Sequence, residues 1–295
     1  MADDASTDDT PAVLAQAAQR DARLRVATVT DKTAPGKKQA LALAIETAQH
    51  DWLLATDADC APASAHWAAA MMDARGPDTR LVLGYGPYRR RPGWLNAWIR
   101  YETVYTAAQY LSAALAGRPY MGVGRNLLYH RSLYDAVGGF AAHAHLAGGD
   151  DDLLVNAAAS AKTTAVCVTP ESFVYSEPKH NWSAYVRQKT RHLSVSHAYE
   201  PSDQRWLGAL AASHLGHYVG LGALLLSGQW PAALGRYAGR QVIVGARMRT
   251  VTHGLGDGDL AKWVPLLDAG VAAYYLGFGI HMLRERIRGA RVREW

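Results

Sequence analysis

Short apolar runs alternate with helical patterns along the first two hundred residues of this chain of 295 residues. The runs with the length of buried strands are residues 24–29, 52–55, 80–85 and 163–169. The stretches that predict helices between them are residues 10–20, 36–49 and 63–74. This alternation is typical of an α/β fold with a mostly parallel sheet covered by helices on both faces. Ligands of such sheets bind beyond the carboxyl ends of the strands, so polar residues there are candidates for a site.

A longer helix is predicted over residues 94–116, and it carries Trp98, Tyr101, Tyr105 and Tyr110. Aromatic residues at helical spacing usually pack in a core, and we favour that interpretation here. The alternative is an apolar face that rests on lipid headgroups.

The character of the chain changes from Trp206 onward. Residues 206–226 and 264–283 are two apolar runs, each of about the 20 residues that cross a bilayer. His214, His217, Asp268 and His281 interrupt them, so two buried helices of a soluble domain are the alternative. Flanking tryptophans and basic residues, Arg284, Arg286 and Arg288 among them, favour membrane spans. Residues 232–249 carry arginines at 236, 240 and 247 among apolar residues, as an interfacial amphipathic helix does.

The formal charge of +5 is modest, and many arginines lie late in the chain rather than in a stripe with aromatic residues. Nucleic acid is therefore not the expected partner, and a membrane surface is favoured. The two cysteines, Cys60 and Cys167, have neither zinc-site spacing nor a disulfide framework, which favours a reducing, cytosol-facing location.

Four short clusters carry the candidate chemistry, and they occur in a fixed order. They are DDAS at residues 3–6, TDADC at 56–60, GGDDD at 148–152 and QKTRH at 188–192. Asp57 and Asp59 follow a predicted strand, and alternation along an extended chain places them on the same side. Two carboxylates there can hold a hard divalent cation, which in turn neutralises a diphosphate. Taken alone, Asp150 to Asp152 are better explained as an acidic first turn of a helix, and only the order of the motifs reverses that preference.

This order of motifs resembles the family-two glycosyltransferases of the GT-A fold, specifically the membrane-attached bacterial type with hydrophobic C-terminal helices. The resemblance covers almost the whole chain. DDASTDDT matches the nucleotide-binding strand end, TDADC the DxD motif, GGDDDLL the catalytic acid cluster, and RQKTRHLS the QxxRW-like motif. It implies a GT-A-like domain over residues 1–200 and a membrane region over residues 201–295.

The resemblance also implies roles for individual residues. Asp4 would read the base of the nucleotide, and Lys37 or Lys38 would lie near the nucleotide. Asp57 and Asp59 would hold Mg²⁺ or Mn²⁺ on the diphosphate, with Asp59 the more direct ligand. Asp151 would be the general base, and Arg125, Asn126 and Asp150 would lie on the acceptor side. Gln188, Arg191 and His192 would close over the diphosphate; His192 stands where tryptophan is usual, which leaves the stacking role open.

The chemistry requires these parts independently of any family. Displacing a nucleoside diphosphate from an anomeric carbon requires its charge to be neutralised, for which a carboxylate-held cation suffices. The attacking hydroxyl must lose a proton, and a carboxylate base contributes roughly 10²–10⁴-fold to the rate.

The resemblance predicts an apolar strand and a helix ahead of the DDAS segment, whereas the sequence opens at Met1-Ala2. We therefore expect a fold that is truncated at its N-terminus. A parallel sheet without an interior strand leaves backbone groups unpaired.

The leading hypothesis is an inverting, metal-dependent glycosyltransferase in envelope or polysaccharide synthesis, on the cytosolic face of the bacterial inner membrane and anchored by two spans. It would use a nucleotide sugar, most simply a UDP-sugar, and a lipid-linked or membrane-proximal acceptor. A non-catalytic membrane-bound remnant is the alternative, and a nucleotidyltransferase is a third possibility that GGDDD and QKTRH disfavour.

Overall fold

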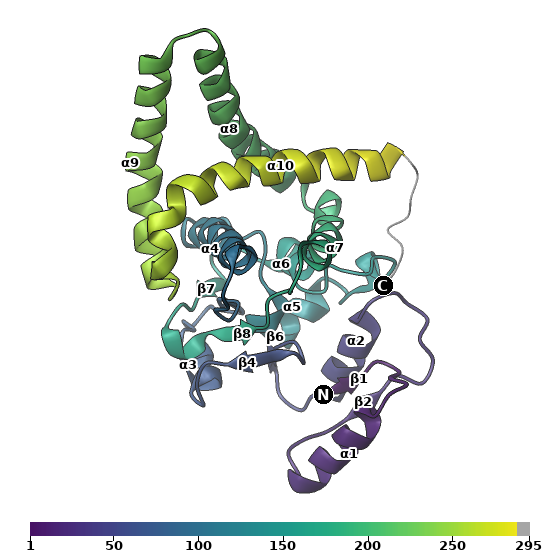
Figure 1. Ribbon diagram of the computed structural model, residues 1–295. Helices are drawn as coiled ribbons and strands as arrows, with labels where there is room; N and C mark the ends of the chain where they lie inside the picture. Colours follow the sequence, from purple (N-terminus) through teal and green to yellow (C-terminus); the bar gives the residue numbers. More distant parts are fainter. Residues whose placement is uncertain (288–295) are drawn as a thin grey trace.

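The computed structural model describes residues 1–287, in which helices and short strands alternate as far as residue 193 and helices alone follow (Figure 1). The strands are β1 Ala2–Asp3, β2 Ala27–Thr28, β3 Trp52–Ala55, β4 Cys60–Pro62, β5 Leu81–Leu83, β6 Leu127–His130, β7 Thr164–Val166 and β8 Val174–Ser176. The helices are α1 Thr10–Arg20, α2 Lys38–Thr47, α3 Trp67–Asp73, α4 Trp94–Leu115, α5 Arg131–Ala136, α6 Asp152–Ala158, α7 Trp182–Leu193, α8 Pro201–Leu226, α9 Trp230–Gly254 and α10 Val264–Ile287.

The central sheet has four strands in the order β3-β6-β5-β7. β6 is antiparallel to both β3 and β5, whereas β5 and β7 are parallel. β3, β5 and β7 therefore share one direction, and β6 opposes them. The expected mostly parallel sheet is in fact mixed. The carboxyl ends of β3, β5 and β7 meet the start of β6 at one edge, and this edge brings the acidic motif after β3 beside the segment that precedes β6.

Two smaller sheets flank the central one. β1 and β2 pair in parallel, and together with α1 and α2 they form the purple lobe in Figure 1. β4 and β8 pair antiparallel, with Cys60 opposite Ser176. β4 follows Asp57 and Asp59 directly, so this pairing fixes the chain on the far side of the acidic motif.

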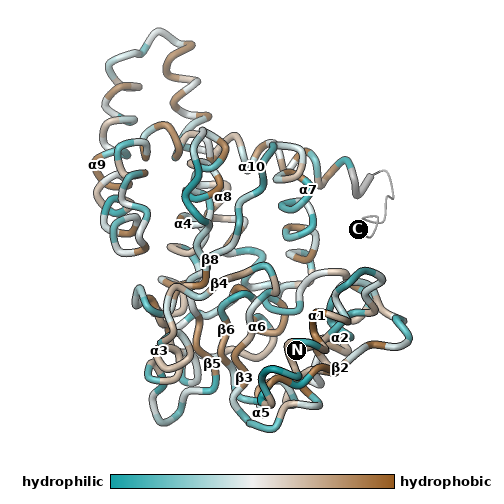
Figure 2. Tube along the Cα trace, turned by 60° about the horizontal axis from the view of Figure 1, so that its bottom comes forward, coloured by the Kyte–Doolittle hydropathy of each residue, from teal (hydrophilic) through white to brown (hydrophobic). Residues whose placement is uncertain are grey.

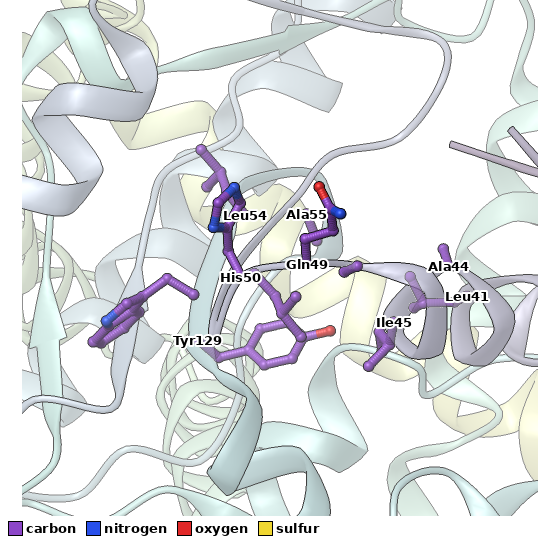
Figure 3. A pocket seen from close by; sticks show the side chains of 11 residues that line it. Leu41, Ala44, Ile45, Gln49, His50, Leu54, Ala55 and Tyr129 are labelled. Atoms are coloured by element: carbon purple, nitrogen blue, oxygen red, sulfur yellow. The ribbon is translucent and has the colours of Figure 1, made fainter. Parts of the chain in front are cut away.

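A cavity of about 280 Å³ lies between α2 and β3, with Tyr129 of β6 in its wall (Figure 3). Its walls are mostly apolar and include Leu41, Ile45, Leu54 and Tyr129. No carboxylate lines it. It is thus a gap beside the sheet and separate from the acidic motifs.

The helix α4 lies in the core of the fold. Trp98, Tyr101 and Tyr110 are buried, and the hydroxyl of Tyr110 donates to the backbone oxygen of Gly84 at 2.7 Å. Tyr105 is partly buried against the same core. The prediction that these aromatic residues pack in a core is confirmed.

The last three helices lie on one side of the molecule. α8 and α9 form an antiparallel hairpin that stands away from the body, and α10 runs crosswise to it above α4 (Figure 1). Two stretches are long and apolar enough to cross a membrane, Pro201–Leu226 and Gly258–Arg284. Only 6% of the most apolar window of α8 is buried, so α8 is not a core helix. Arg288, expected to flank the second run, lies outside the described residues.

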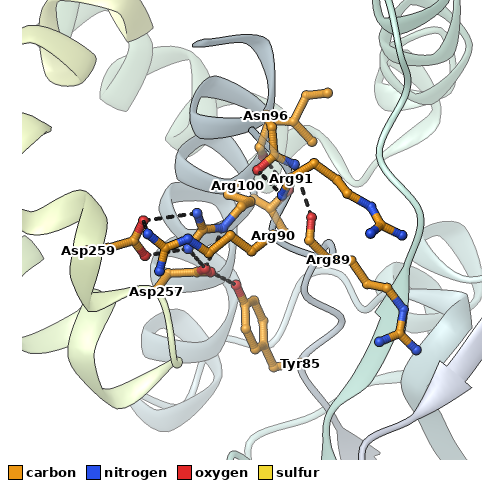
Figure 4. Close-up of polar contacts among 10 residues, drawn as sticks. Tyr85, Arg89, Arg90, Arg91, Asn96, Arg100, Asp257 and Asp259 are labelled. Carbon is orange, nitrogen blue, oxygen red and sulfur yellow. Dashed lines mark hydrogen bonds and ion pairs between the residues drawn. The ribbon is translucent and has the colours of Figure 1, made fainter. Parts of the chain in front are cut away.

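A buried ion-pair network fastens the segment between α9 and α10 to α4 (Figure 4). Arg100 donates to Asp257 from Nε at 2.8 Å and to Asp259 from Nη1 at 3.1 Å. The hydroxyl of Tyr85 also donates to Asp257, at 3.2 Å. Arg100 and Asp257 are 4% and 7% exposed in their side chains, so both charges depend on each other for compensation.

Candidate active site

The acid pair after β3 forms the clearest candidate for a metal site. Ligand atoms of Asp57, Asp59 and Cys60 all lie within 4.8 Å of one another. Carboxylate oxygens are the ligands that Mg²⁺ and Mn²⁺ prefer. Cys60 is the poorer ligand, because burial raises the pKa of its thiol and its sulfur lies 3.0 Å from Ser176 Oγ in a hydrogen bond. The two carboxylates therefore fit a hard divalent cation.

Lys37 connects this acid pair to the second acidic cluster. Its Nζ lies 2.5 Å from Asp57 Oδ1 and 3.1 Å from Asp150 Oδ2. Desolvation lowers the pKa of Lys37, but the charges of Asp150 and Asp57 outweigh that effect and raise it. Lys37 is thus cationic, and about half of its side chain stays open to solvent at the centre of the site.

Lys38 has a different place. Its side chain is buried, and its Nζ donates to the backbone oxygens of His143 and Leu146, both at 2.7 Å, and of Gly148. Gly36 has a φ of 70°, and a Cβ there would clash with the backbone oxygen of Ala147. The loop before α2 therefore packs on the loop that carries the acidic cluster. Of the two predicted lysines, Lys37 faces the site and Lys38 holds the loop.

Asp151 lies at the N-terminus of α6. Its Oδ2 accepts a hydrogen bond of 2.6 Å from the backbone nitrogen of Gly124. A Cβ on Gly124 would lie 3.1 Å from Asp151, so a side chain there would push the Asp151 carboxylate by a few tenths of an ångström. This contact links α6 to the segment that precedes β6, and it fixes the direction of the Asp151 carboxylate.

Asp150 and Asp152, the neighbours of Asp151 in the chain, both have raised pKa values. Burial, together with the charge of Asp151, raises the pKa of Asp150 to about 6, although Lys37 opposes the shift. Burial and Asp151 raise the pKa of Asp152 to about 8, and Asp152 accepts a hydrogen bond of 2.8 Å from the hydroxyl of Tyr199. The cluster therefore carries fewer than three negative charges at neutral pH.

Arg125 and Asn126 precede β6 and differ in exposure. The Arg125 guanidinium lies 4.7 Å from the ring centre of Tyr88, and its buried Nε has no hydrogen-bond partner within residues 1–287. Asn126 is fully buried; it accepts from Trp67 at 2.9 Å and donates to the backbone oxygens of Tyr85 and Ser172. The structure thus engages the Asn126 amide in the fold, and Arg125 donates from Nη2 to the backbone oxygen of Gly86 while its charge also reaches His192.

The helix α7 lies beside the site and carries Lys189 and Arg191, and we call it the cationic wall. It begins at the N-cap Asn181, which accepts from the backbone of Ala184, and Gln188 Nε2 donates to the Tyr88 hydroxyl at 3.2 Å. His192 is open to solvent, yet the protein around it removes much of its hydration and lowers its pKa. Four nearby cations lower it further: Lys189, Arg191, Arg125 and Lys37. His192 therefore lies beside the cationic side chains of the site.

Asp4 completes the set at the end of β1, where its Oδ2 lies 2.6 Å from Lys32 Nζ. The structure thus brings Lys37, Asp57, Asp59, Asp150 and Asp151 together, with Arg125 and α7 beside them, and leaves Asp4 with Lys32. Gly124, Tyr88 and Tyr199 lie outside the four motifs, and Lys189 lies within QKTRH without a role that the resemblance implied.

Comparison with known families decides the class of this site. The family model described as "Glycosyltransferase like family 2" matches residues 1–194, about two thirds of the chain. The chain belongs to this glycosyltransferase family. Family-two membership makes it a glycosyltransferase, as the acidic motifs and the cationic wall indicate.

One solved structure shares the fold at low sequence identity. The mannosyltransferase PcManGT from Pyrobaculum calidifontis, in complex with GDP-Man and Mn²⁺, is 19% identical with a TM-score of 0.51, over 92% of this glycosyltransferase and 76% of PcManGT. TarS 1-349 of S. aureus is 15% identical with a TM-score of 0.40, over 71% and 68% of the two chains. Curated proteins compared by sequence give no match. The GT-A-like fold is confirmed by the family and by PcManGT.

Proposed function

We propose that this glycosyltransferase transfers a sugar, with inversion, from a nucleoside diphosphate to a hydroxyl of a lipid-linked or membrane-proximal acceptor. The observation that carries the proposal is the position of Lys37, between Asp57 of the metal pair and Asp150 of the acid cluster. The residues that would bind the leaving diphosphate therefore lie next to the acidic cluster that would activate the acceptor hydroxyl.

The donor side consists of Asp57, Asp59, Lys37 and the cationic wall. A divalent cation held by the two carboxylates would supply charge neutralisation for the diphosphate. Lys37, Arg125 and Arg191 supply further positive charge, because an anionic leaving group is stabilised by fixed cations nearby. His192 is neutral by its lowered pKa, so it contributes as a hydrogen-bonding group.

The acceptor side depends on Asp151. The hydrogen bond from Gly124 fixes one carboxylate oxygen and leaves the other for the acceptor hydroxyl. Removing the hydroxyl proton at this oxygen makes the acceptor a nucleophile. A single displacement with one base inverts the anomeric centre, and no second carboxylate nucleophile is required.

The location we propose is the cytosolic face of the bacterial inner membrane, in synthesis of an envelope or polysaccharide component. Its support is the exposed apolar surface of α8, together with the chain's basic charge and unpaired cysteines.

The test is release of nucleoside diphosphate from a panel of donors, with Mn²⁺, Mg²⁺ or EDTA, in the presence of membrane lipids as acceptors. The panel contains UDP-sugars and GDP-mannose, since PcManGT binds GDP-Man. We expect turnover with one nucleotide class, loss of turnover in EDTA, and a product of inverted anomeric configuration. Absence of turnover with every donor would favour the alternative of a non-catalytic remnant.

A further inference from the structure

We propose that the hairpin of α8 and α9 inserts its tip into one leaflet of an anionic bilayer and that α10 lies along the same membrane surface. In this arrangement neither α8 nor α10 crosses the bilayer, contrary to the two spans that the sequence predicts. The inference concerns membrane attachment and does not depend on the proposed reaction.

The tip of the hairpin formed by α8 and α9 exposes apolar side chains. We define it as residues 219–235, which contain no charged residue. Val219, Leu226, Trp230 and Leu234 are 70%, 93%, 67% and 60% exposed, so the tip presents apolar side chains on both helices. Figure 2 shows the end of this hairpin projecting beyond the rest of the chain. Large apolar groups exposed together at a protrusion mark an interaction surface.

The charges below the tip limit how deep it reaches. Arg236 is exposed and follows Trp230 by six residues, which corresponds to about 9 Å along a helix. On α8, the counterpart stretch from Val219 to Leu226 extends over about 10.5 Å by the same rise. One leaflet has about 15 Å of hydrocarbon, half of the bilayer core of about 30 Å. The uncharged tip therefore matches one leaflet, and a full crossing would carry Arg236 into the hydrocarbon.

The structure of α10 argues against a second crossing. Val264, Leu267 and Val271 are buried in the core of the fold, and Asp268 is fully buried. Asp268 accepts from Arg240 of α9 at 2.7 Å and from Tyr218 of α8 at 2.6 Å. The first half of α10 is therefore part of the folded body, and its axis runs crosswise to the hairpin (Figure 1). Perpendicular helices cannot both lie along the membrane normal.

The second half of α10 has a face that suits the membrane surface. Leu276, Ile280 and Leu283 are 56%, 43% and 58% exposed, and their spacing places them on one stripe of the helix. Tyr274, on another face, packs against Trp98 of α4 at 6.1 Å between ring centres. A helix that packs one face on protein and exposes an apolar stripe can bury that stripe at the membrane surface.

A lipid bilayer fits these surfaces better than a second copy of the chain. The hairpin has an apolar tip, while Arg236, Arg247 and Arg249 lie exposed farther down α9. The apolar tip suits the hydrocarbon of one leaflet, and the arginines suit its anionic headgroups. Trp230 at the tip adds the aromatic residue that is common in membrane-embedded anchors.

The experiment uses the full chain in sealed vesicles of phosphatidylglycerol and phosphatidylethanolamine, with Cys60 and Cys167 replaced by serine. Ser227→Cys labels the tip, and Thr250→Cys on the same helix pair is the matched control near the body. Each is coupled to a bimane fluorophore and quenched by lipids that carry a nitroxide at a headgroup or at a known acyl depth. We expect acyl-chain quenching at residue 227 within one leaflet, and headgroup or aqueous quenching alone at residue 250.

A membrane-impermeant maleimide then distinguishes insertion from crossing. We expect the cysteine introduced at position 227 to be protected on both sides, and any reaction of Leu266→Cys and Leu283→Cys to come from the same side. Reaction of residue 227 from the side opposite to residue 250, or of residues 266 and 283 from opposite sides, would show spanning helices and overturn the proposal. Absence of lipid quenching at residue 227, with a dimer by light scattering, would overturn it in favour of a second copy.

Discussion

The Nζ of Lys37 lies 2.5 Å from Oδ1 of Asp57, whereas the Nζ of the neighbouring Lys38 donates to the backbone oxygens of His143 and Leu146. Lys37 thus belongs to the site, whereas Lys38, the next residue, stabilises the fold. This relationship gives a pair of substitutions of the same type with different expected results.

Lys37→Met should weaken binding of the nucleoside diphosphate by about tenfold or more, because a charge-assisted hydrogen bond is worth about 1.5–3 kcal/mol. It should change the melting temperature little, since half of the side chain is exposed. Lys38→Met should instead lower the melting temperature, because each buried carbonyl left unpaired costs about 1–3 kcal/mol. Calorimetric binding and thermal melting of both variants check the pair; the same result for both would contradict the division.

Asp59→Asn should abolish the dependence of diphosphate binding on Mn²⁺. An amide oxygen is neutral, so the substituted pair keeps only the Asp57 carboxylate, half of the charge that attracts the cation. Isothermal titration calorimetry of the nucleoside diphosphate, with Mn²⁺ and with EDTA, measures this. The exposed Asp78→Asn, remote from the pair, is the control. An unchanged gain in affinity from Mn²⁺ in Asp59→Asn would exclude Asp59 as a ligand.

The stability of the protein should fall as pH rises toward 8. The folded pKa of Asp152 is about 8, above its ordinary value of 3.8, so the folded state holds a proton that the unfolded state has lost in this window. Stability from this group is complete below about pH 4 and is lost as pH rises through the folded pKa. Asp152→Asn, which imitates the protonated acid, should melt with a weaker pH dependence between pH 5 and 8. If the melting temperatures of the two proteins changed equally with pH, the raised pKa of Asp152 would be refuted.

Arg100→Met should destabilise the fold by about 3–5 kcal/mol, because it leaves the buried charge of Asp257 without compensation. Arg23→Ala is the control, since the Arg23 side chain is 91% exposed in its pair with Asp21 and such pairs contribute little. Denaturant unfolding compares the two. A loss in Arg100→Met no larger than in the control would show that the network does not fasten the C-terminal helices.

Much of the fold could be predicted from local patterns. The bounds of α1 and β3 agree with the prediction, and those of α4 differ by one residue at its end. The antiparallel strands β4, β6 and β8 were missed. β6 has four residues and passes directly into α5, with no turn residue between them, and its pairing with β3 and β5 joins positions far apart in the sequence.

Site residues that belong to a sequence motif could be predicted from the sequence. Residues whose position depends on packing between distant segments could not. The acidic pair after β3 could be recognised because an extended chain places alternate residues on one side. The burial of Asn126 could not, because its partners Trp67, Tyr85 and Ser172 come from three distant segments. The hydrogen bond of Tyr199 to Asp152 is similar, since it joins residues 47 positions apart.

The most direct test of the account is single-turnover sugar transfer by Asp151→Asn. The amide oxygen can still accept the hydrogen bond from Gly124, so the site keeps its geometry and loses the base. We expect the transfer rate to fall roughly 10²–10⁴-fold while the affinity for the nucleotide sugar stays within about twofold, because the base acts only as the hydroxyl attacks. A transfer rate close to that of the unmodified enzyme would contradict the central claim that Asp151 activates the acceptor.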